Sequence, residues 1–143
     1  MSGNGAETTV RVLDSWAVMA WLQDEPAAEK VDQLWRQAGK GKIRLVMSAV
    51  NVGEVFYLTA RWRGTREAEV VLAQMQELPL EIRTSPNALI WEAARIKAAH
   101  RLSYADAFAV ATAIREDAPL VTGDLELKTL AEQGVLTLEW VRT

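Results

Sequence analysis

The chain contains no cysteine among its 143 residues and only one histidine, His100. The absence of cysteine excludes disulfides and thiolate metal sites, and it is typical of a protein that works in the reducing cytoplasm. A single histidine without a nearby acid is most often an ordinary surface or capping residue, and we assign it no role. No apolar run approaches the roughly 18 residues that a membrane-spanning helix needs. We therefore expect a cytoplasmic protein without a membrane segment.

An excess of positive charge is also absent, since 16 Lys and Arg residues stand against 19 Asp and Glu residues and give a formal net charge of −3. The hydrophobic share of 50% and the charged share of 24% are normal for a globular protein. The length suits one domain of ordinary size with a real core. Residues 1–9 are small and polar and lack the features of a signal peptide. We predict a disordered tail over 1–9 and a single domain over 10–143.

Short apolar runs alternate along the chain with segments of helical periodicity. The predicted strands are 10–13, 43–47, 79–82, 120–122 and 135–139. The predicted helices are 15–23, 26–38, 49–62, a segment that starts at 65, 85–100, 103–117 and 125–132. Because helices separate the strands, the connections are crossovers and the sheet is parallel. The sequence therefore predicts an α/β fold with three layers, α/β/α.

Two acids stand alone in predicted helices that are apolar nearly all round. Glu54 shares a helix face with Asn51, three residues before it. Asp106 lies near the start of another apolar helix, three residues after Ser103. A lone carboxylate in such a helix is costly unless something compensates for it. For Glu54 the alternative to chemistry is a buried ion pair or a partly exposed edge, and for Asp106 it is a variant capping box with Ser103.

Two further acids directly follow predicted strands. Asp14 comes after the strand 10–13, and Asp124 closely follows the strand 120–122. Taken alone, either residue could be an ordinary helix N-cap. In an open parallel sheet, however, ligands bind at the carboxyl ends of the strands. Glu54 lies on the helix after the second strand, 43–47, and Asp106 lies in the first turn of the helix that leads into the fourth strand, so all four acids can converge on one crevice.

Carboxylates that share a crevice repel one another. Two unit charges about 4 Å apart cost roughly 4 kcal/mol at an effective dielectric of about 20, so folding requires a cation or shared protons to offset the repulsion. Oxygen ligands without His or Cys suit Mg²⁺ or Mn²⁺ and disfavour zinc. Such ions orient a phosphate, lower the pKa of a bound water and stabilise a leaving oxygen. The constellation predicts metal-dependent hydrolysis of a phosphodiester.

At these residues the chain resembles the PIN-domain family and, within it, the VapC-type toxins of type II toxin–antitoxin pairs. The matching stretches are 12–17, 48–55, 102–107 and 120–124. No single stretch is specific, because an acid after a strand is common. Four such stretches in the expected order and spacing, in a chain of fitting length, form a strong signal that covers nearly the whole sequence.

The resemblance implies a five-stranded parallel sheet of order 3-2-1-4-5 between helices. It also implies a Mg²⁺-dependent endoribonuclease, usually a homodimer, that cleaves RNA and is held inactive by a small antitoxin protein. The residues that carry over are the catalytic and metal-binding acids Asp14, Glu54, Asp106 and Asp124, with Ser15, Asn51 and Thr122 as supporting residues.

Arg61, Arg63 and Arg66 cluster where one predicted helix ends and the next begins. Because cations favour helix C-termini, one interpretation is a solvated group that complements the helix dipole. The other is a contact with RNA phosphate or with an acidic antitoxin segment. Setting the four site acids apart from the 19 leaves 15 acids against 16 basic residues, so RNA binding depends on such local arginine patches and on bound metal.

Other classes of protein fit the sequence less well. A receiver-like phosphoacceptor domain needs an Asp at the end of the third strand, but residues 80–84 contain none. A nucleotide-binding fold is weakly indicated, because the pair Gly39 and Gly41 precedes a strand where the fingerprint should follow one. A binding module that keeps the PIN fold and its partner surface with little or no catalytic activity stays open, and metal-dependent turnover would separate it from a nuclease.

Overall fold

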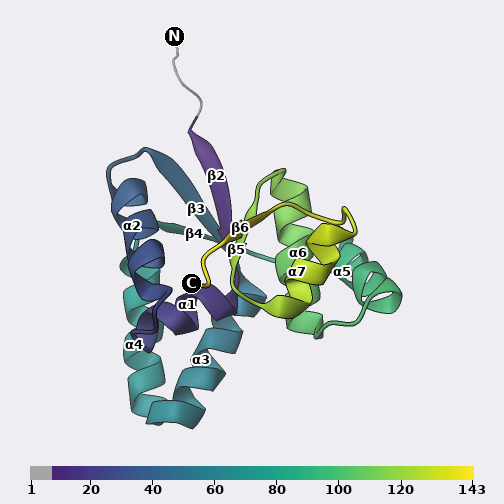
Figure 1. The fold of residues 1–143 in the computed structure, drawn as a ribbon. Coiled ribbons are helices and arrows are strands. Elements are labelled where there is room, and N and C mark those ends of the chain that lie inside the picture. Colours follow the sequence, from purple (N-terminus) through teal and green to yellow (C-terminus); the bar gives the residue numbers. More distant parts are fainter. Residues whose placement is uncertain (1–7) are drawn as a thin grey trace.

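The computed structural model describes residues 8–143 and is built around one parallel sheet (Figure 1). The predicted tail over 1–9 lies outside the described residues except for its last two, and the first described strand already begins at Thr9. The strand order is β4 (Leu80–Arg83), β3 (Ile43–Ser48), β2 (Thr9–Leu13), β5 (Leu120–Thr122), β6 (Leu138–Trp140), and each neighbouring pair is parallel. This arrangement confirms the predicted order 3-2-1-4-5.

Helices cover both faces of the sheet and make it the middle of three layers (Figure 1). One face carries α1 (Ser15–Leu22), α2 (Ala28–Gly39), α3 (Ala49–Arg63) and α4 (Thr65–Glu77), and the other carries α5 (Asn87–Ala99), α6 (Tyr104–Glu116) and α7 (Leu125–Glu132). Alternate strand residues point to opposite faces. Leu13, Leu45 and Val121 pack in the first core, while Val12, Val46 and Leu120 pack in the second.

Local side-chain chemistry sets several helix boundaries close to the predicted ones. The Ser48 hydroxyl caps α3 by accepting a hydrogen bond from the amide of Val50 at 3.2 Å. Gly64, at a φ of +92°, separates α3 from α4, and this positive φ strains any residue with a Cβ. The long predicted helix over 49–62 therefore ends one residue later than expected, and α4 begins at Thr65 as predicted.

The predicted strand over 135–139 is wrong at its start, since β6 begins only at Leu138. The backbone closes the end of α7 first: Gly134 takes a φ of +81°, and the amide of Val135 donates to the carbonyl of Leu130 at 3.1 Å. The apolar side chain of Val135 packs against the core beside α7 and is not part of a strand.

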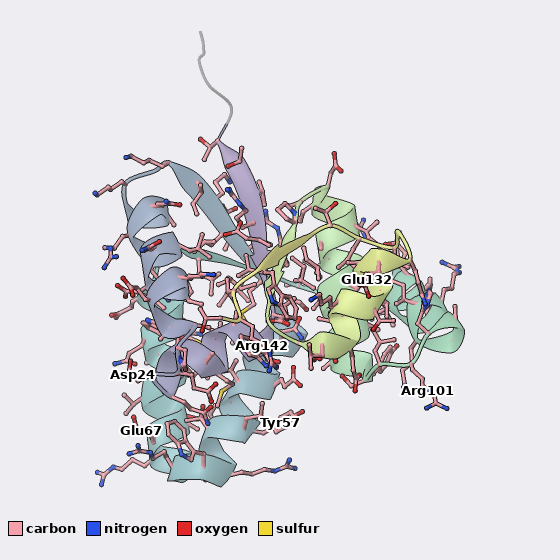
Figure 2. All side chains as sticks on the ribbon, viewed as in Figure 1. Asp24, Tyr57, Glu67, Arg101, Glu132 and Arg142 are labelled. Atoms are coloured by element: carbon pink, nitrogen blue, oxygen red, sulfur yellow. The ribbon has the colours of Figure 1, made fainter. Side chains whose placement is uncertain are left out.

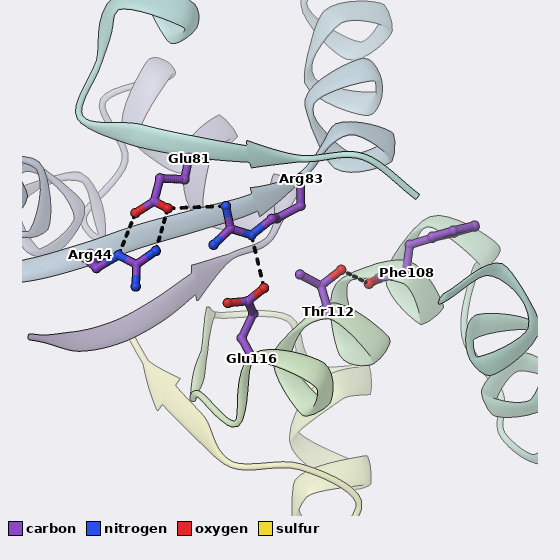
Figure 3. Close-up of polar contacts among 6 residues, drawn as sticks. All are labelled: Arg44, Glu81, Arg83, Phe108, Thr112 and Glu116. Atoms are coloured by element: carbon purple, nitrogen blue, oxygen red, sulfur yellow. Dashed lines mark hydrogen bonds and ion pairs between the residues drawn. The ribbon is translucent and has the colours of Figure 1, made fainter. Parts of the chain in front are cut away.

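Charged side chains join the outer strands of the sheet to the end of α6 (Figure 3). Arg44 on β3 donates to both carboxylate oxygens of Glu81 on β4, at 2.8 and 2.6 Å. Arg83 then lies 3.2 Å from Glu81 and donates to Glu116 at 3.1 Å. The Arg44 hydrogen bond lowers the pKa of Glu81, so this network stays charged at neutral pH. It ties the edge strand to the helix whose first turn carries Asp106.

No helix in the described part of the chain is long and apolar enough to cross a membrane.

Candidate active site

A cavity of about 270 Å³ lies where the carboxyl ends of the central strands meet the helix starts, and the acids gather there. Glu54 from α3, Asp106 from the first turn of α6 and Asp124 at the start of α7 all line it. Ser15, the predicted supporting residue at the start of α1, lines it as well. The structure therefore brings three predicted acids, from three different helices, to one cavity.

Asp14 is buried beside this cavity, with 1% of its surface exposed, and does not line it. Its Oδ1 accepts a hydrogen bond from the amide of Ala17 at 2.9 Å, so Asp14 is the N-cap of α1. The pKa of Asp14 is raised to about 8, mainly by burial and also by the charges of Asp106 and Asp124, against the opposing effect of its hydrogen bonds to Thr122 and Ala17. The influence of both other acids shows that Asp14 belongs to the same electrostatic cluster.

Thr122, the last residue of β5, connects Asp14 to Asp124. Its buried hydroxyl donates a hydrogen bond to Oδ2 of Asp14 and accepts one from the amide of Asp124 at 3.0 Å. Asp124 in turn caps α7, because its Oδ1 accepts from the amide of Glu126 at 2.9 Å. Both strand-end acids are thus helix N-caps, and both lie in or beside the acidic cavity, so the capping role does not remove them from the predicted site.

Asp106 lies in the first turn of α6, where its amide donates to the Ser103 hydroxyl at 3.0 Å. The pKa of Asp106 is raised to about 7, mainly by burial and also by the charges of Asp124 and Glu54. Ser103 therefore caps the helix as the sequence suggested, but the cap uses the Asp106 backbone. The carboxylate remains part of the acidic cavity.

Asn51 ties α3 to α6 beside the acids. Its buried side-chain nitrogen donates to the carbonyl of Ala105 at 3.0 Å and makes a longer contact of 3.4 Å with Oε1 of Glu54. Glu54 forms no ion pair with any residue that the structure describes, so the buried-pair alternative for this acid is not what the structure shows. Through these two contacts, Asn51 instead links the Glu54 carboxylate to the backbone of Ala105, the residue before Asp106.

The cavity carries an excess of negative charge, since no Lys or Arg is among its lining residues. Its polar side chains offer carboxylate, hydroxyl and amide oxygens, which is the ligand chemistry that suits Mg²⁺ or Mn²⁺. Over residues 8–143, however, no three acidic or histidine side chains stand close enough together to hold one ion. The residues present fit a hard cation in their chemistry and charge, and their carboxylates have to move closer to share one.

The predicted arginine cluster lies away from this cavity. Arg61 and Arg63, both exposed, end α3, and Arg66 follows in the first turn of α4. Arg61 stacks 5.0 Å above the ring of Tyr57, and Arg63 stacks 4.4 Å above that of Trp62. The structure therefore places these arginines on an exposed helical corner, near the labelled Tyr57 (Figure 2), and not among the acids.

One basic residue that sequence reasoning missed does lie beside the site. The guanidinium of Arg142 stacks 5.2 Å from the centre of the Trp16 ring, which lines the cavity, and its Nε donates to the carbonyl of Gly123 at 2.7 Å. Figure 2 shows Arg142 where the chain returns toward α1. No local pattern around residue 142 points to this role, because the contact depends on how β6 is placed in the sheet.

The sequence profile of the PIN domain matches residues 11–133 of this chain. That stretch contains the acids of the cavity together with Asn51 and Thr122, and it ends before β6 and Arg142. No functionally curated protein matches the chain by sequence.

Solved structures share the fold at low sequence identity. The chain is similar to the sarcin–ricin loop cleaving toxin VapC20 of Mycobacterium tuberculosis, with 16% identity over 84% of this chain and 94% of that one and a TM-score of 0.68. It is similar to VapBC2 of Rickettsia felis, solved with a DNA fragment of its promoter, with 16% identity, coverage of 94% and 100%, and a TM-score of 0.70. It is also similar to VapBC-1 of nontypeable Haemophilus influenzae, with 16% identity over 92% of this chain and 98% of that one and a TM-score of 0.67.

Proposed function

The chain belongs to the PIN domain family, and from this premise we propose that it is a Mg²⁺-dependent endoribonuclease that acts as the toxin of a toxin–antitoxin pair. The observation that carries the proposal is the convergence of Glu54, Asp106 and Asp124 on one cavity with Asp14 buried beside it. Such a cluster opposes folding when it is charged, because burial and neighbouring acids raise the pKa of both Asp14 and Asp106. Groups perturbed in this way are typical of functional sites.

Asp14, Glu54, Asp106 and Asp124 are the residues that would hold the ion. A bound Mg²⁺ or Mn²⁺ orients the phosphate, lowers the pKa of a water and stabilises the leaving oxygen. The hydroxyl of Thr122 fixes one oxygen of Asp14, and the amide of Ala17 fixes the other. Asn51 holds Glu54 near the start of α6. These contacts orient Asp14 and Glu54 at a site that is acidic without a cation, and ion binding would draw the carboxylates closer together.

We also propose an antitoxin protein and a second copy of the chain as partners. In support, large apolar side chains remain exposed in the described chain, among them Trp91 at 54%, Ile114 at 47% and Leu125 at 58%. The exposed corner with Arg61, Arg63 and Arg66 suits an acidic antitoxin segment or RNA phosphate. VapBC structures from other organisms share the fold, which agrees with a partner of this type.

Cleavage of a labelled RNA pool tests the enzymatic proposal. We expect the wild-type protein to cleave RNA with Mg²⁺ and to lose this activity when EDTA is added. Asp106→Asn should be inactive, because it removes one carboxylate from the cavity. Asp117→Asn is the matched control: it makes the same chemical change at the other end of α6, at a φ of +50° that Asn tolerates well.

Cleavage by wild type and Asp117→Asn, but not by Asp106→Asn or with EDTA, would establish a metal-dependent ribonuclease and exclude a contaminant. Equal activity of Asp106→Asn would show that the acidic cavity is not the active site. No cleavage of the pool or of the cell's ribosomal and transfer RNA would favour a binding module with the PIN fold.

A further inference from the structure

The segment from Leu138 to Arg142 runs alongside the loop that carries Asp124. Trp140 pairs with Thr122 in the β5–β6 register, the amide of Val141 donates to the Thr122 carbonyl at 3.0 Å, and Arg142 donates to the Gly123 carbonyl at 2.7 Å. These contacts follow β5 one residue at a time toward the acids. They deliver the side chain of Arg142 to the edge of the cavity.

Trp16 and Gly123 hold Arg142 in this place. The Trp16 ring lies so close to Gly123 that a Cβ there would stand 2.3 Å from its Cη2 atom, so only glycine leaves room for the ring. Trp16 lines the cavity, and the Arg142 guanidinium stacks 5.2 Å from the ring centre. Stacking on an aromatic ring leaves the edge of a guanidinium free to donate hydrogen bonds.

The charge of Arg142 has no partner among residues 8–143, since it forms no ion pair there and its Nε alone is used by a backbone carbonyl. The side chain is exposed. The cavity itself is lined by acids and by no Lys or Arg, and it repels a polyanion. The Arg142 guanidinium, which has free hydrogen-bond donors at the cavity edge, therefore lies where a positive charge would attract the phosphates of an RNA strand.

We propose that Arg142 binds a phosphate of the RNA strand next to the cleaved bond, and that Trp16 and Gly123 position it for this contact. The inference rests on the proposed ribonuclease function and adds a substrate-binding residue that lies outside the family match over residues 11–133. A guanidinium with free donors suits a phosphate oxygen pair, and a neighbouring aromatic ring suits single-stranded RNA.

RNA binding and cleavage by Arg142→Gln test this role. The probe is a fluorescein-labelled single-stranded RNA, with binding followed by anisotropy in EDTA and cleavage followed in Mg²⁺. Arg101→Gln is the matched control, because it removes the same charge from an exposed arginine between α5 and α6 that does not line the cavity and that Figure 2 shows well apart from Arg142. Arg142→Lys keeps the charge but loses the planar fork, so it separates charge from geometry.

We expect Arg142→Gln to raise both Kd and KM about tenfold with a smaller change in kcat, as the loss of a charged hydrogen bond predicts. The slope of log Kd against log salt should fall by about 0.7, the value of one phosphate contact on a single strand. The Kd and KM of Arg142→Lys should lie between those of Arg142→Gln and the wild type. Arg101→Gln should have wild-type values.

If wild type cleaves RNA and Arg142→Gln keeps its Kd, KM and salt slope, the role of Arg142 is refuted while the ribonuclease stands. Equal losses in Arg142→Gln and Arg101→Gln would also refute it, because they would reflect net charge alone. If the wild type neither binds nor cleaves RNA, the proposed function fails first and the inference fails with it.

Discussion

The Thr122 hydroxyl donates a hydrogen bond to Asp14 across 108 positions of the chain, and it joins the ends of two neighbouring strands. The same oxygen accepts the amide of Asp124 at 3.0 Å. One buried hydroxyl therefore fixes the relative positions of two acids that the chain brings together from opposite ends of the domain. Because this hydroxyl is buried and makes both hydrogen bonds, replacing it has consequences for stability and for the site.

Thr122→Val should lower the free energy of unfolding by about 1–3 kcal/mol, because it leaves a buried carboxylate oxygen and a backbone amide without partners at unchanged volume. The Mg²⁺ concentration needed for half-maximal activity should rise, since Asp14 loses an orienting donor. Urea denaturation and a Mg²⁺ titration of cleavage measure the two effects. Thr122→Ser keeps the hydroxyl and should retain wild-type metal dependence, and an equal loss in both variants would assign the effect to packing alone.

The metal-free protein should lose stability as the pH rises. The pKa of Asp14 is raised from 3.8 to about 8 and that of Asp106 to about 7, so the folded protein keeps protons that the unfolded chain has released. This contribution is complete below about pH 4 and disappears as the pH passes through about 7 to 8. Urea denaturation in EDTA, at steps between about pH 5 and about pH 9, measures the trend.

Asp14→Asn and Asp106→Asn should each flatten this pH dependence, because the substituted amide does not titrate. Asp117→Asn should keep the wild-type slope. A wild-type curve that parallels both amide variants over the whole range would mean that neither acid titrates abnormally.

Mg²⁺ should raise the melting temperature of the wild type through preferential binding to the folded state. At ten times its Kd an ion contributes about 1.4 kcal/mol, which corresponds to about 3–5 °C for a domain of this size. Asp106→Asn should melt at a higher temperature than wild type in EDTA, because repulsion with Asp124 and Glu54 is removed, and it should respond less to Mg²⁺. If Mg²⁺ raised the melting temperature of the wild type and of Asp106→Asn equally, the ion would bind outside the acidic cavity.

Gly123→Ala should destabilise the protein by about 1–3 kcal/mol, since the new methyl group overlaps the Trp16 ring. Trp16→Phe shortens the side chain and should recover part of the loss when combined with Gly123→Ala, which a double-mutant cycle measures. Gly53→Ala is the control, because nothing lies within 4 Å of that position inside α3 and alanine favours a helix. Additive effects of the Trp16 and Gly123 changes would mean that the two residues do not interact.

Nearly all element positions could be predicted from the sequence, because buried parallel strands are short apolar runs and the helices carry clear caps. The strand order came only from the resemblance to the PIN-domain family. Ser48 and Gly64 mark the ends of α3 within a residue. The start of β6 could not be predicted, since Val135 is equally apolar in a strand or in the core beside α7. The Val135 amide donates a hydrogen bond to the Leu130 carbonyl, which keeps Val135 at the end of α7 and out of the strand. The pattern of apolar residues does not reveal this contact.

For the site, the acids could be listed from the sequence but their different environments could not. Asp14 is buried and Asp124 is half-buried, although both follow a strand and cap a helix. Both strands are interior to the sheet, but Asp14 accepts a hydrogen bond from Thr122 of the neighbouring strand and is enclosed there, a contact that only the assembled sheet shows. Arg142 was missed for the same reason: its neighbours Trp16 and Gly123 are distant in the chain, and register alone brings them together.

The pairing of β2 with β5 also has a consequence for the order of events during protein synthesis. The central strand is made first, yet one of its neighbours and the Asp124 loop are made more than a hundred residues later. A nascent chain that holds only β2, β3 and β4 lacks Asp106, Asp124 and the Thr122 hydroxyl that fixes Asp14. On the proposed function, a growing polypeptide cannot attack RNA near the ribosome that makes it until β5 has emerged and docked.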